Sequence, residues 1–314
     1  MKKKAIIISI KGYKLLEKER EILKNEKPWG LILFKRNINN LNQIKKLVKE
    51  IRIVSKDRKF PIMIDEEGSS VTRLGEILYN NISQKNLGDF YLIEKKISLL
   101  IYKNYIKKIT SVLKDIGINI NTVPVLDVLQ KETHKIIEDR CFSRNKNIVK
   151  KLGKFCIKHY EMNKVGTVIK HIPGHGCASS DSHFKMPIVK KSLQKLKEID
   201  FFPFKSSKSK FAMTAHIRYE NIDKKNVATF SKRIIKNVIR KKMRFKGILI
   251  SDDISMKALK YNLLENAKRS LSAGCNLVLY CSGNYRDAHK LVRALPFIDK
   301  FTAKKTSEFY KFLR

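Results

Sequence analysis

Residues 168–183 read V-I-K-H-I-P-G-H-G-C-A-S-S-D-S-H: an apolar run ends in Lys170-His171 and leads into a loop punctuated by proline and glycine. Asp181 and His183 close the stretch. A strand, a flexible loop and a carboxylate beside an imidazole can place an acid–base group at the mouth of a barrel or sheet. The concentration of histidine, lysine and aspartate favours a site over a polar loop whose histidines cap backbone groups.

Short apolar runs of the same kind recur along the chain and alternate with stretches of helical period. Eight have the composition of buried parallel strands: Ala5–Ile10, Gly30–Phe34, Pro61–Ile64, Asn119–Val125, Thr167–Ile169, Phe211–Thr214, Gly247–Ile250 and Asn276–Tyr280. The helical stretches are Leu41–Val54, Leu87–Ile116 (long enough for two helices), Ile148–Met162, Ile234–Met243 and Met256–Ala273. This alternation predicts an α/β fold, a (β/α)8 TIM-type barrel. An open doubly wound sheet is the alternative, although no G-x-G-x-x-G follows the first strand.

Ionisable residues follow five of these runs directly. The five segments are Asp65-Glu66-Glu67-Gly68, Leu126-Asp127, Lys170-His171, Ala215-His216 and Ser251-Asp252-Asp253. In a barrel the carboxyl ends of the strands converge on one face, where catalysis takes place. We therefore expect these side chains to form one site.

The composition describes a globular, strongly basic chain. It has 314 residues, 43% of them hydrophobic, and a formal net charge of +39. We expect one catalytic domain over residues 1–314, because α/β barrels of this length are single domains. The lysines are spread along the chain with abundant isoleucine and asparagine, the residues that an AT-rich genome over-supplies. We interpret the charge as compositional and expect no specific nucleic-acid partner.

The cysteines and the N-terminus bear on location. Five cysteines, an odd number without zinc or redox spacing, fit a reducing cytoplasm. The start M-K-K-K-A-I-I-I-S-I-K-G resembles a signal peptide, but its apolar run is only six residues long and no small-residue cleavage site follows. We expect a first strand there, no membrane span, and a cytoplasmic monomer.

Two reactions fit the predicted set of side chains. One is glycoside hydrolysis, in which a carboxylate attacks the sugar carbon and an acid protonates the leaving oxygen. The other is metal-assisted hydrolysis, with ligands from His171, His175, His183, His216 and Asp252. His171 and His175 have the zinc spacing of a helix, but Pro173 and Gly174 between them disfavour that helix. We therefore predict no metal.

Several segments carry a resemblance to glycoside hydrolase family 3. K-H-I-P-G-H-G at 170–176 with D-S-H at 181–183 resembles the family signature K-H-F-P-G-H-G followed by D-x-H. Four other segments resemble family segments in the family's order: I-D-E-E-G-S-S-V-T-R-L at 64–74, P-V-L-D-V at 124–128, E-D-R-C-F-S at 138–143 and G-I-L-I-S-D-D-I-S-M at 247–256. The D-S-H dyad and the length are similar to the bacterial β-N-acetylhexosaminidase branch that acts in cell-wall recycling.

The resemblance implies catalytic roles for three residues. Asp252 would be the nucleophile that forms a glycosyl-enzyme, while Asp253 suits a solvated or helix-capping role better. His183 would be the acid/base, oriented by Asp181. An imidazole in place of the usual second carboxylate is chemically reasonable, because it gives and takes a proton near neutrality.

The resemblance also implies a sugar pocket. Asp65 would accept bonds from sugar hydroxyls. The side chains that would complete the pocket are Arg73, Arg140, Lys170 and His171. His175 and His216 either hold a loop or touch substrate. The sequence departs from the family at Gly68-Ser69-Ser70, where two glycines and an arginine are usual, so the loop geometry there is open.

The sequence as a whole predicts an active retaining glycosidase without a cofactor. It would remove terminal β-linked N-acetylglucosamine from 1,6-anhydro-muropeptides, with GlcNAc-anhydroMurNAc and its peptides as substrates. The alternatives are a β-glucosidase of the same family, a metal-dependent TIM-barrel hydrolase, and a basic nucleic-acid-binding protein with a vestigial site.

Overall fold

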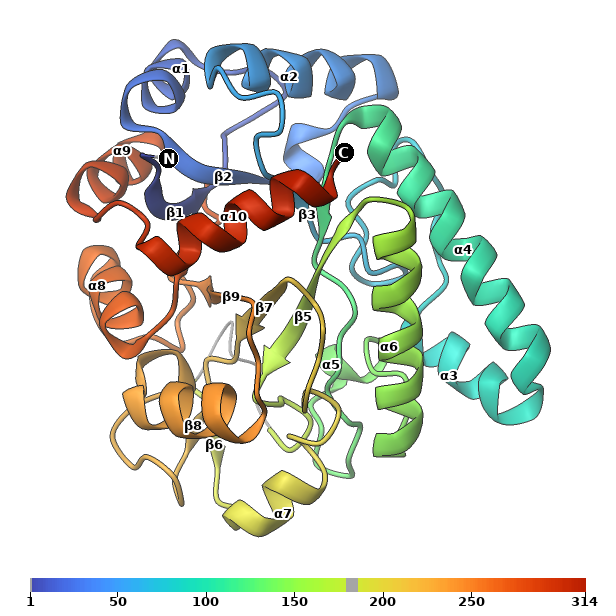
Figure 1. Ribbon diagram of the computed structural model, residues 1–314. Helices are drawn as coiled ribbons and strands as arrows, with labels where there is room; N and C mark the ends of the chain where they lie inside the picture. Colours follow the sequence, from blue (N-terminus) through green and yellow to red (C-terminus); the bar gives the residue numbers. More distant parts are fainter. Residues whose placement is uncertain (1, 179–185) are drawn as a thin grey trace.

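The computed structural model describes residues 2–178 and 186–314, and a closed barrel of eight parallel strands forms its centre (Figure 1). The strands are β1 (Lys4–Ile8), β2 (Pro28–Leu33), β3 (Ile62–Ile64), β4 (Ile120–Asn121), β5 (Gly166–Ile172), β7 (Phe211–Thr214), β9 (Ile248–Asp253) and β10 (Leu277–Tyr280). Their order around the barrel is β1-β10-β9-β7-β5-β4-β3-β2. Every predicted run contributes one strand, so the TIM-type barrel is confirmed and the open sheet is wrong.

Helices surround the barrel and connect its strands (Figure 1). The α-helices are α1 (Glu17–Glu21), α2 (Leu41–Val54), α3 (Gln84–Ile93), α4 (Lys95–Ile116), α5 (Lys135–Glu138), α6 (Lys146–Met162), α7 (Leu193–Glu198), α8 (Leu263–Ala273), α9 (Tyr285–Ala294) and α10 (Lys300–Phe312). The 3-10 helices are Lys35–Asn37 and Ala228–Phe230, and the π-helical segments are Ile22–Glu26 and Ile234–Lys242. Two short strands outside the barrel, β6 (Ile188–Val189) and β8 (Arg218–Tyr219), pair with each other.

The predicted helices differ from the observed ones mainly at their ends. The stretch 87–116 divides into two helices at Glu94, whose carboxylate accepts a bond of 3.2 Å from the amide of Lys96 at the start of α4. The helix expected from Met256 begins instead at Leu263. Its N-cap is Asn262, whose side chain accepts the amide of Glu265 at 2.9 Å, and turns fill the residues before it.

The barrel core has two layers because successive strand residues point to opposite sides. Ile7, Phe211 and Leu279 belong to the cluster that fills the inside of the barrel. Their strand neighbours Ile8 and Ala212 belong to the larger cluster between strands and helices. All of these side chains are nearly inaccessible to water, so the uninterrupted apolar runs reflect strands that are buried on both faces.

Helix α10 closes one end of the barrel. Its Phe309 ring meets the Phe211 ring edge-on, with 5.1 Å between centroids, at the amino end of β7. The indole of Trp29 donates a 2.9 Å bond to the hydroxyl of Thr306. Sequence analysis did not predict α9 or α10. Because α10 covers the amino ends of the strands, a ligand must approach the barrel interior from their carboxyl ends.

We predict that Gly88→Ala destabilises the chain by about 2 kcal/mol although alanine is the better helix former. A Cβ atom at Gly88 in α3 would lie 1.6 Å from the carbonyl oxygen of Phe142, so the helix would have to move. Gly12→Ala is the control, because nothing lies within 4 Å of its Cβ position. Urea unfolding measures both variants, and an equal effect of the two substitutions would contradict the prediction.

Candidate active site

A cavity of about 350 Å³ opens at the carboxyl ends of the barrel strands. Met213 and Leu279 from the barrel interior form part of its wall. The polar residues that line it are Asp65, Glu67, Ser70, Arg73, Arg140, Lys170, His171, His175, Asp252 and Asp253. The cavity therefore combines apolar surface with acids, cations and imidazoles, which suits a catalytic pocket.

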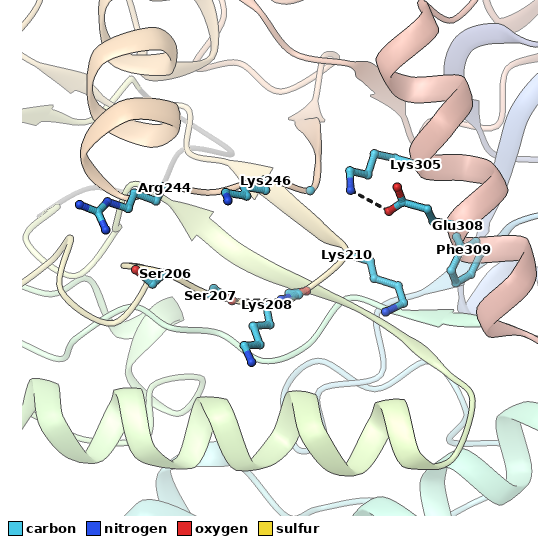
Figure 2. Close-up of a pocket in the computed structure, with 11 residues that line it drawn as sticks. Ser206, Ser207, Lys208, Lys210, Arg244, Lys246, Lys305, Glu308 and Phe309 are labelled. Carbon is cyan, nitrogen blue, oxygen red and sulfur yellow. Dashed lines mark hydrogen bonds and ion pairs between the residues drawn. The ribbon is translucent and has the colours of Figure 1, made fainter.

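A larger cavity of about 460 Å³ lies near the amino ends of β7 and β9 (Figure 2). Five cations contribute to its lining: Lys208, Lys210, Arg244, Lys246 and Lys305. Its single lining carboxylate, Glu308, is paired with Lys305 at 2.7 Å. Because no second carboxylate and no histidine line this cavity, we place the catalytic site at the carboxyl ends.

Asp65 follows β3 and is held by groups from three other segments. Lys170 Nζ lies 3.3 Å from its Oδ1, Arg73 Nη2 lies 3.5 Å from its Oδ2, and the Thr122 hydroxyl donates to Oδ1. Burial alone would raise the pKa of Asp65, but the charges of Lys170 and Arg73 outweigh burial and hold this pKa well below its usual range. Asp65 is therefore an ionised acceptor at neutral pH.

Glu67 forms the most extensive ion pair of the site. Arg140 Nε and Nη2 donate to its two oxygens at 2.8 and 3.0 Å, and Lys170 Nζ lies 2.6 Å from Oε1. All three side chains are buried. Burial alone would raise the pKa of Glu67, but the charges of Arg140 and Lys170 outweigh burial and lower this pKa to about 2. The same pairing raises the pKa of Arg140 despite its burial.

Asp127 anchors the segment that follows β5. Its carboxylate accepts the His171 ring Nδ1 at 2.7 Å and the amide of His175 at 2.6 Å. With Nδ1 as donor, His171 Nε2 is left as the acceptor facing Arg140 Nη2 at 3.4 Å. Burial lowers the pKa of His175 to about 4, so this ring is neutral at pH 7. His175 Nδ1 is buried without a hydrogen-bond partner in the described chain.

The loop after β3 is organised by the buried carboxylate of Glu66, which accepts the amides of Arg73 and Leu74 at 2.7 and 3.0 Å. This fixes the backbone from which the Arg73 side chain reaches Asp65. Gly68 has φ of +97°, and a Cβ there would lie 2.1 Å from the carbonyl oxygen of Ile82. Ser69, where the family usually has glycine, also has a positive φ, of 51°. Ser69 therefore adopts the left-handed backbone conformation that a glycine at this position would adopt at lower cost.

Asp252 and Asp253 end β9 and have different surroundings. Asp252 lines the cavity, and its Oδ1 accepts the amide of Asp253 at 2.8 Å. Asp253 accepts the amides of Ser255 and Cys281 at 3.1 and 3.2 Å. Burial raises the pKa of Asp253. The expectation of a solvated or helix-capping Asp253 is corrected in part: the residue is partly buried and lines the cavity, and its carboxylate caps the turn at Ser255 instead of a helix.

Of the candidate metal ligands that the structure describes, His216 lies apart from the cavity that the others line. His216 bonds to Thr229 at 2.7 Å and to the carbonyl oxygen of Asp253 at 3.0 Å, and it does not line the cavity. It therefore holds two loops together, while His175 lines the cavity. Within residues 2–178 and 186–314, no group of three or more histidine, cysteine, aspartate or glutamate side chains is placed to hold a metal ion.

Six of the eight predicted site residues line this one cavity: Asp65, Arg73, Arg140, Lys170, His171 and Asp252. The other two, Asp181 and His183, lie outside the described residues. Sequence analysis expected Glu67 and Asp127 in the site but gave neither residue a role of its own. The available signal was their position: Glu67 comes two residues after Asp65, and Asp127 lies in the P-V-L-D-V segment.

This arrangement can bind a polar ligand and attack it. Asp65 offers an ionised acceptor, Lys170 and Arg140 offer donors held by ion pairs, and Asp252 offers a carboxylate on another side of the barrel mouth. Carboxylate acceptors and fixed donors around an apolar-walled cavity match the hydroxyl-rich surface of a sugar. The fold and the site together define a barrel enzyme of the glycoside hydrolase class.

Comparisons with known proteins identify the family. Residues 2–302 match the glycosyl hydrolase family 3 N-terminal domain. A β-hexosaminidase of Neisseria meningitidis serogroup C is 31% identical over 88% of this chain and 78% of its own length. One from Shewanella frigidimarina is 32% identical over 88% and 82%. The chain belongs to glycosyl hydrolase family 3, and it is an enzyme, a glycosidase of the β-hexosaminidase type.

A solved structure supports the same placement. The structure of NagZ from Neisseria gonorrhoeae in complex with N-trifluoroacetyl-D-glucosamine superposes with a TM-score of 0.87 at 27% identity, covering 100% of this chain and 91% of that one. The native structure of that protein gives a TM-score of 0.87 at 28% identity. The barrel is therefore shared along the whole described chain.

We predict that Glu67→Gln destabilises the chain by about 3 kcal/mol at pH 7, because it removes the negative charge that pairs with the buried cations Lys170 and Arg140. The folded pKa of Glu67, about 2, lies below its ordinary value of 4.5. Its contribution is therefore complete above pH 4.5 and is lost as the pH falls toward 2. The difference from the parent should shrink at pH 3 in urea unfolding. Exposed Glu21→Gln is the control, and an equal difference at both pH values would contradict the assignment.

Proposed function

We propose that this enzyme removes terminal β-linked N-acetylglucosamine from peptidoglycan-derived fragments, the 1,6-anhydro-muropeptides, through a covalent glycosyl-enzyme. The observation that carries the proposal is the ion-paired set of Asp65, Lys170, Glu67 and Arg140 in the same cavity as Asp252. The bound N-trifluoroacetyl-D-glucosamine named for the gonococcal structure supports an N-acylated glucosamine as the sugar. We propose one catalytic domain over residues 1–314 that acts as a cytoplasmic monomer. The five free cysteines are consistent with a reducing compartment.

In this proposal Asp252 attacks the anomeric carbon of the sugar. A bond forms between its carboxylate oxygen and that carbon while the bond to the leaving oxygen breaks. The amide of Asp253 donates to Asp252 Oδ1 and so helps to fix the orientation of the attacking carboxylate. Water then displaces Asp252 from the same carbon. Two displacements restore the starting anomeric configuration.

The sugar is held by groups whose positions are already fixed. Asp65 accepts hydroxyl protons, while Lys170 and Arg140 donate to sugar oxygens. Their ion pairs with Asp65 and Glu67 restrict these long side chains before the sugar arrives, so less conformational entropy is lost on binding. His171 borders the same pocket and is oriented by Asp127.

The proton is handled in our proposal by His183, oriented by Asp181. The chain leading toward this dyad leaves β5 at the carboxyl end of the barrel, and Asp127 anchors it through the amide of His175. The leaving sugar alcohol needs a proton as its bond to the anomeric carbon breaks. His183 supplies that proton and later takes one from the attacking water.

The substrate is tested with paired nitrophenyl glycosides that differ only in the 2-acetamido group. The proposed enzyme hydrolyses the β-N-acetylglucosaminide much faster than the β-glucoside, and it releases N-acetylglucosamine from GlcNAc-anhydroMurNAc. Faster turnover of the β-glucoside would show a β-glucosidase instead.

We predict that Asp252→Ala lowers turnover by about 10⁴-fold or more, whereas Asp253→Ala lowers it far less. The reason is that only Asp252 forms the covalent bond, while Asp253 holds the turn at Ser255. A fluorosugar that traps the glycosyl-enzyme should label Asp252, as mapped by peptide mass spectrometry. Label on another residue, or an inverted product by NMR, would refute this mechanism.

We predict that His183→Ala slows hydrolysis of a natural disaccharide severely but slows glycosylation by a nitrophenyl glycoside far less. A good leaving group departs without a proton, so only the poor one depends on the acid. The covalent intermediate should also accumulate. Asp181→Ala should show a milder form, and the double variant should be little worse than His183→Ala. Equal losses with both leaving groups would assign His183 to sugar binding.

A further inference from the structure

Five exposed aliphatic side chains gather where α3 meets α4: Leu92, Ile93, Ile97, Leu100 and Ile101. Ile93 is 81% exposed and Leu92 is 59% exposed. Fourteen large apolar side chains are exposed on the described chain, and five of them lie within residues 92–101. This clustering distinguishes the group from isolated exposed residues. The α3–α4 corner, defined as residues 92–101, lies at the outer edge of the molecule (Figure 1).

These side chains are not needed to hold α4 on the barrel. The inward stripe of α4 is already complete, with Tyr102, Ile106 and Ile109 buried at helical spacing. Ile97, Leu100 and Ile101 occupy another face of the helix. An apolar face that remains after the core contact has been made is available for an outside partner.

The partner's charge follows from the lysines around the corner. Helix α4 carries six exposed lysines, and five of them lie in its first fourteen residues: Lys95, Lys96, Lys103, Lys107 and Lys108. No ion pair joins any of them to a carboxylate among the described residues. The acid nearest in sequence, Glu94, is engaged at the helix start. A second copy of a chain with a charge of +39 would repel this surface, whereas an anionic partner would be attracted to it.

We propose that the α3–α4 corner docks on an anionic phospholipid bilayer. The aliphatic side chains enter the boundary between head groups and acyl chains, and the lysines bind lipid phosphates while their stems lie along apolar surface. No helix in the described part of the chain is long and apolar enough to cross a membrane, so the contact is interfacial.

Docking of this corner would bring the active-site end of the barrel toward the bilayer. Helix α4 runs back from the carboxyl end of β3 toward the start of β4, so its first turn lies at the end of the barrel where the strand carboxyl ends meet. The candidate active site opens at that same end.

The experiment is co-sedimentation of the full chain with vesicles of equal parts phosphatidylglycerol and phosphatidylcholine, and with pure phosphatidylcholine vesicles. We expect binding to the anionic vesicles that weakens with added salt. Ile93→Ser/Ile97→Ser should reduce the partition coefficient by about tenfold or more. Lys95→Gln/Lys96→Gln should reduce it about twentyfold.

Matched controls carry the same substitutions elsewhere on the surface. Ile53→Ser/Ile188→Ser removes two other exposed isoleucines, and Lys241→Gln/Lys242→Gln removes the same charge from another surface. These should bind nearly as well as the parent, and every variant should hydrolyse a small soluble aryl glycoside at the parent rate.

Three results would overturn the proposal. They are absence of binding to anionic vesicles, equal losses in corner and control variants, and a concentration-dependent dimer by analytical ultracentrifugation that the Ile93→Ser/Ile97→Ser variant abolishes. The second result would mean that net charge alone binds lipid. The third would make the corner an interface between copies of this chain.

Discussion

The buried ammonium of Lys170 is the constraint on which the active site depends. A cation at this depth is costly to take out of water unless carboxylates meet it, and both Asp65 and Glu67 do so. Arg140 balances the second negative charge. These two cations and two carboxylates, with Arg73 as a further partner of Asp65, connect the end of β5 to the loop after β3 and to the segment after α5.

This pairing of charges also prepares the site for a hydroxyl-rich sugar. Because Asp65 has a strongly lowered pKa, it remains an acceptor across the physiological range. The long side chains of Lys170 and Arg140 are held before any ligand binds, which is how a site gains affinity without new contacts. Asp252 comes from β9 and lines the same cavity, so in the proposed mechanism sugar binding and bond making use separate groups at one opening.

The barrel was predictable because its strands are buried on both faces and read as short, uninterrupted apolar runs. The length of residues 87–116 indicated room for two helices, but the division at Glu94 was not predicted. The pairing of Glu67 with Arg140 joins residues 73 positions apart, and no local pattern reveals such a contact. Because this contact has no local signal, Arg140 was expected only to bind the sugar, whereas its side chain also forms an ion pair with Glu67. His216 was ambiguous for the same reason, because its bonds to Thr229 and to the Asp253 carbonyl depend on the closed barrel.

The large positive charge and the chemistry of the site are separable in this fold. Substitutions at exposed positions change stability little, so lysine can accumulate there without disturbing the barrel. Charges inside the site cannot drift in this way, because the loss of one partner leaves another buried charge unpaired. Surface charge beyond about 10 Å is also largely screened at 0.1 M salt, whereas the ion pairs at Lys170 are direct contacts. The excess positive charge on the surface therefore influences which partners approach the protein. The ion-paired charges inside determine which ligand the cavity binds.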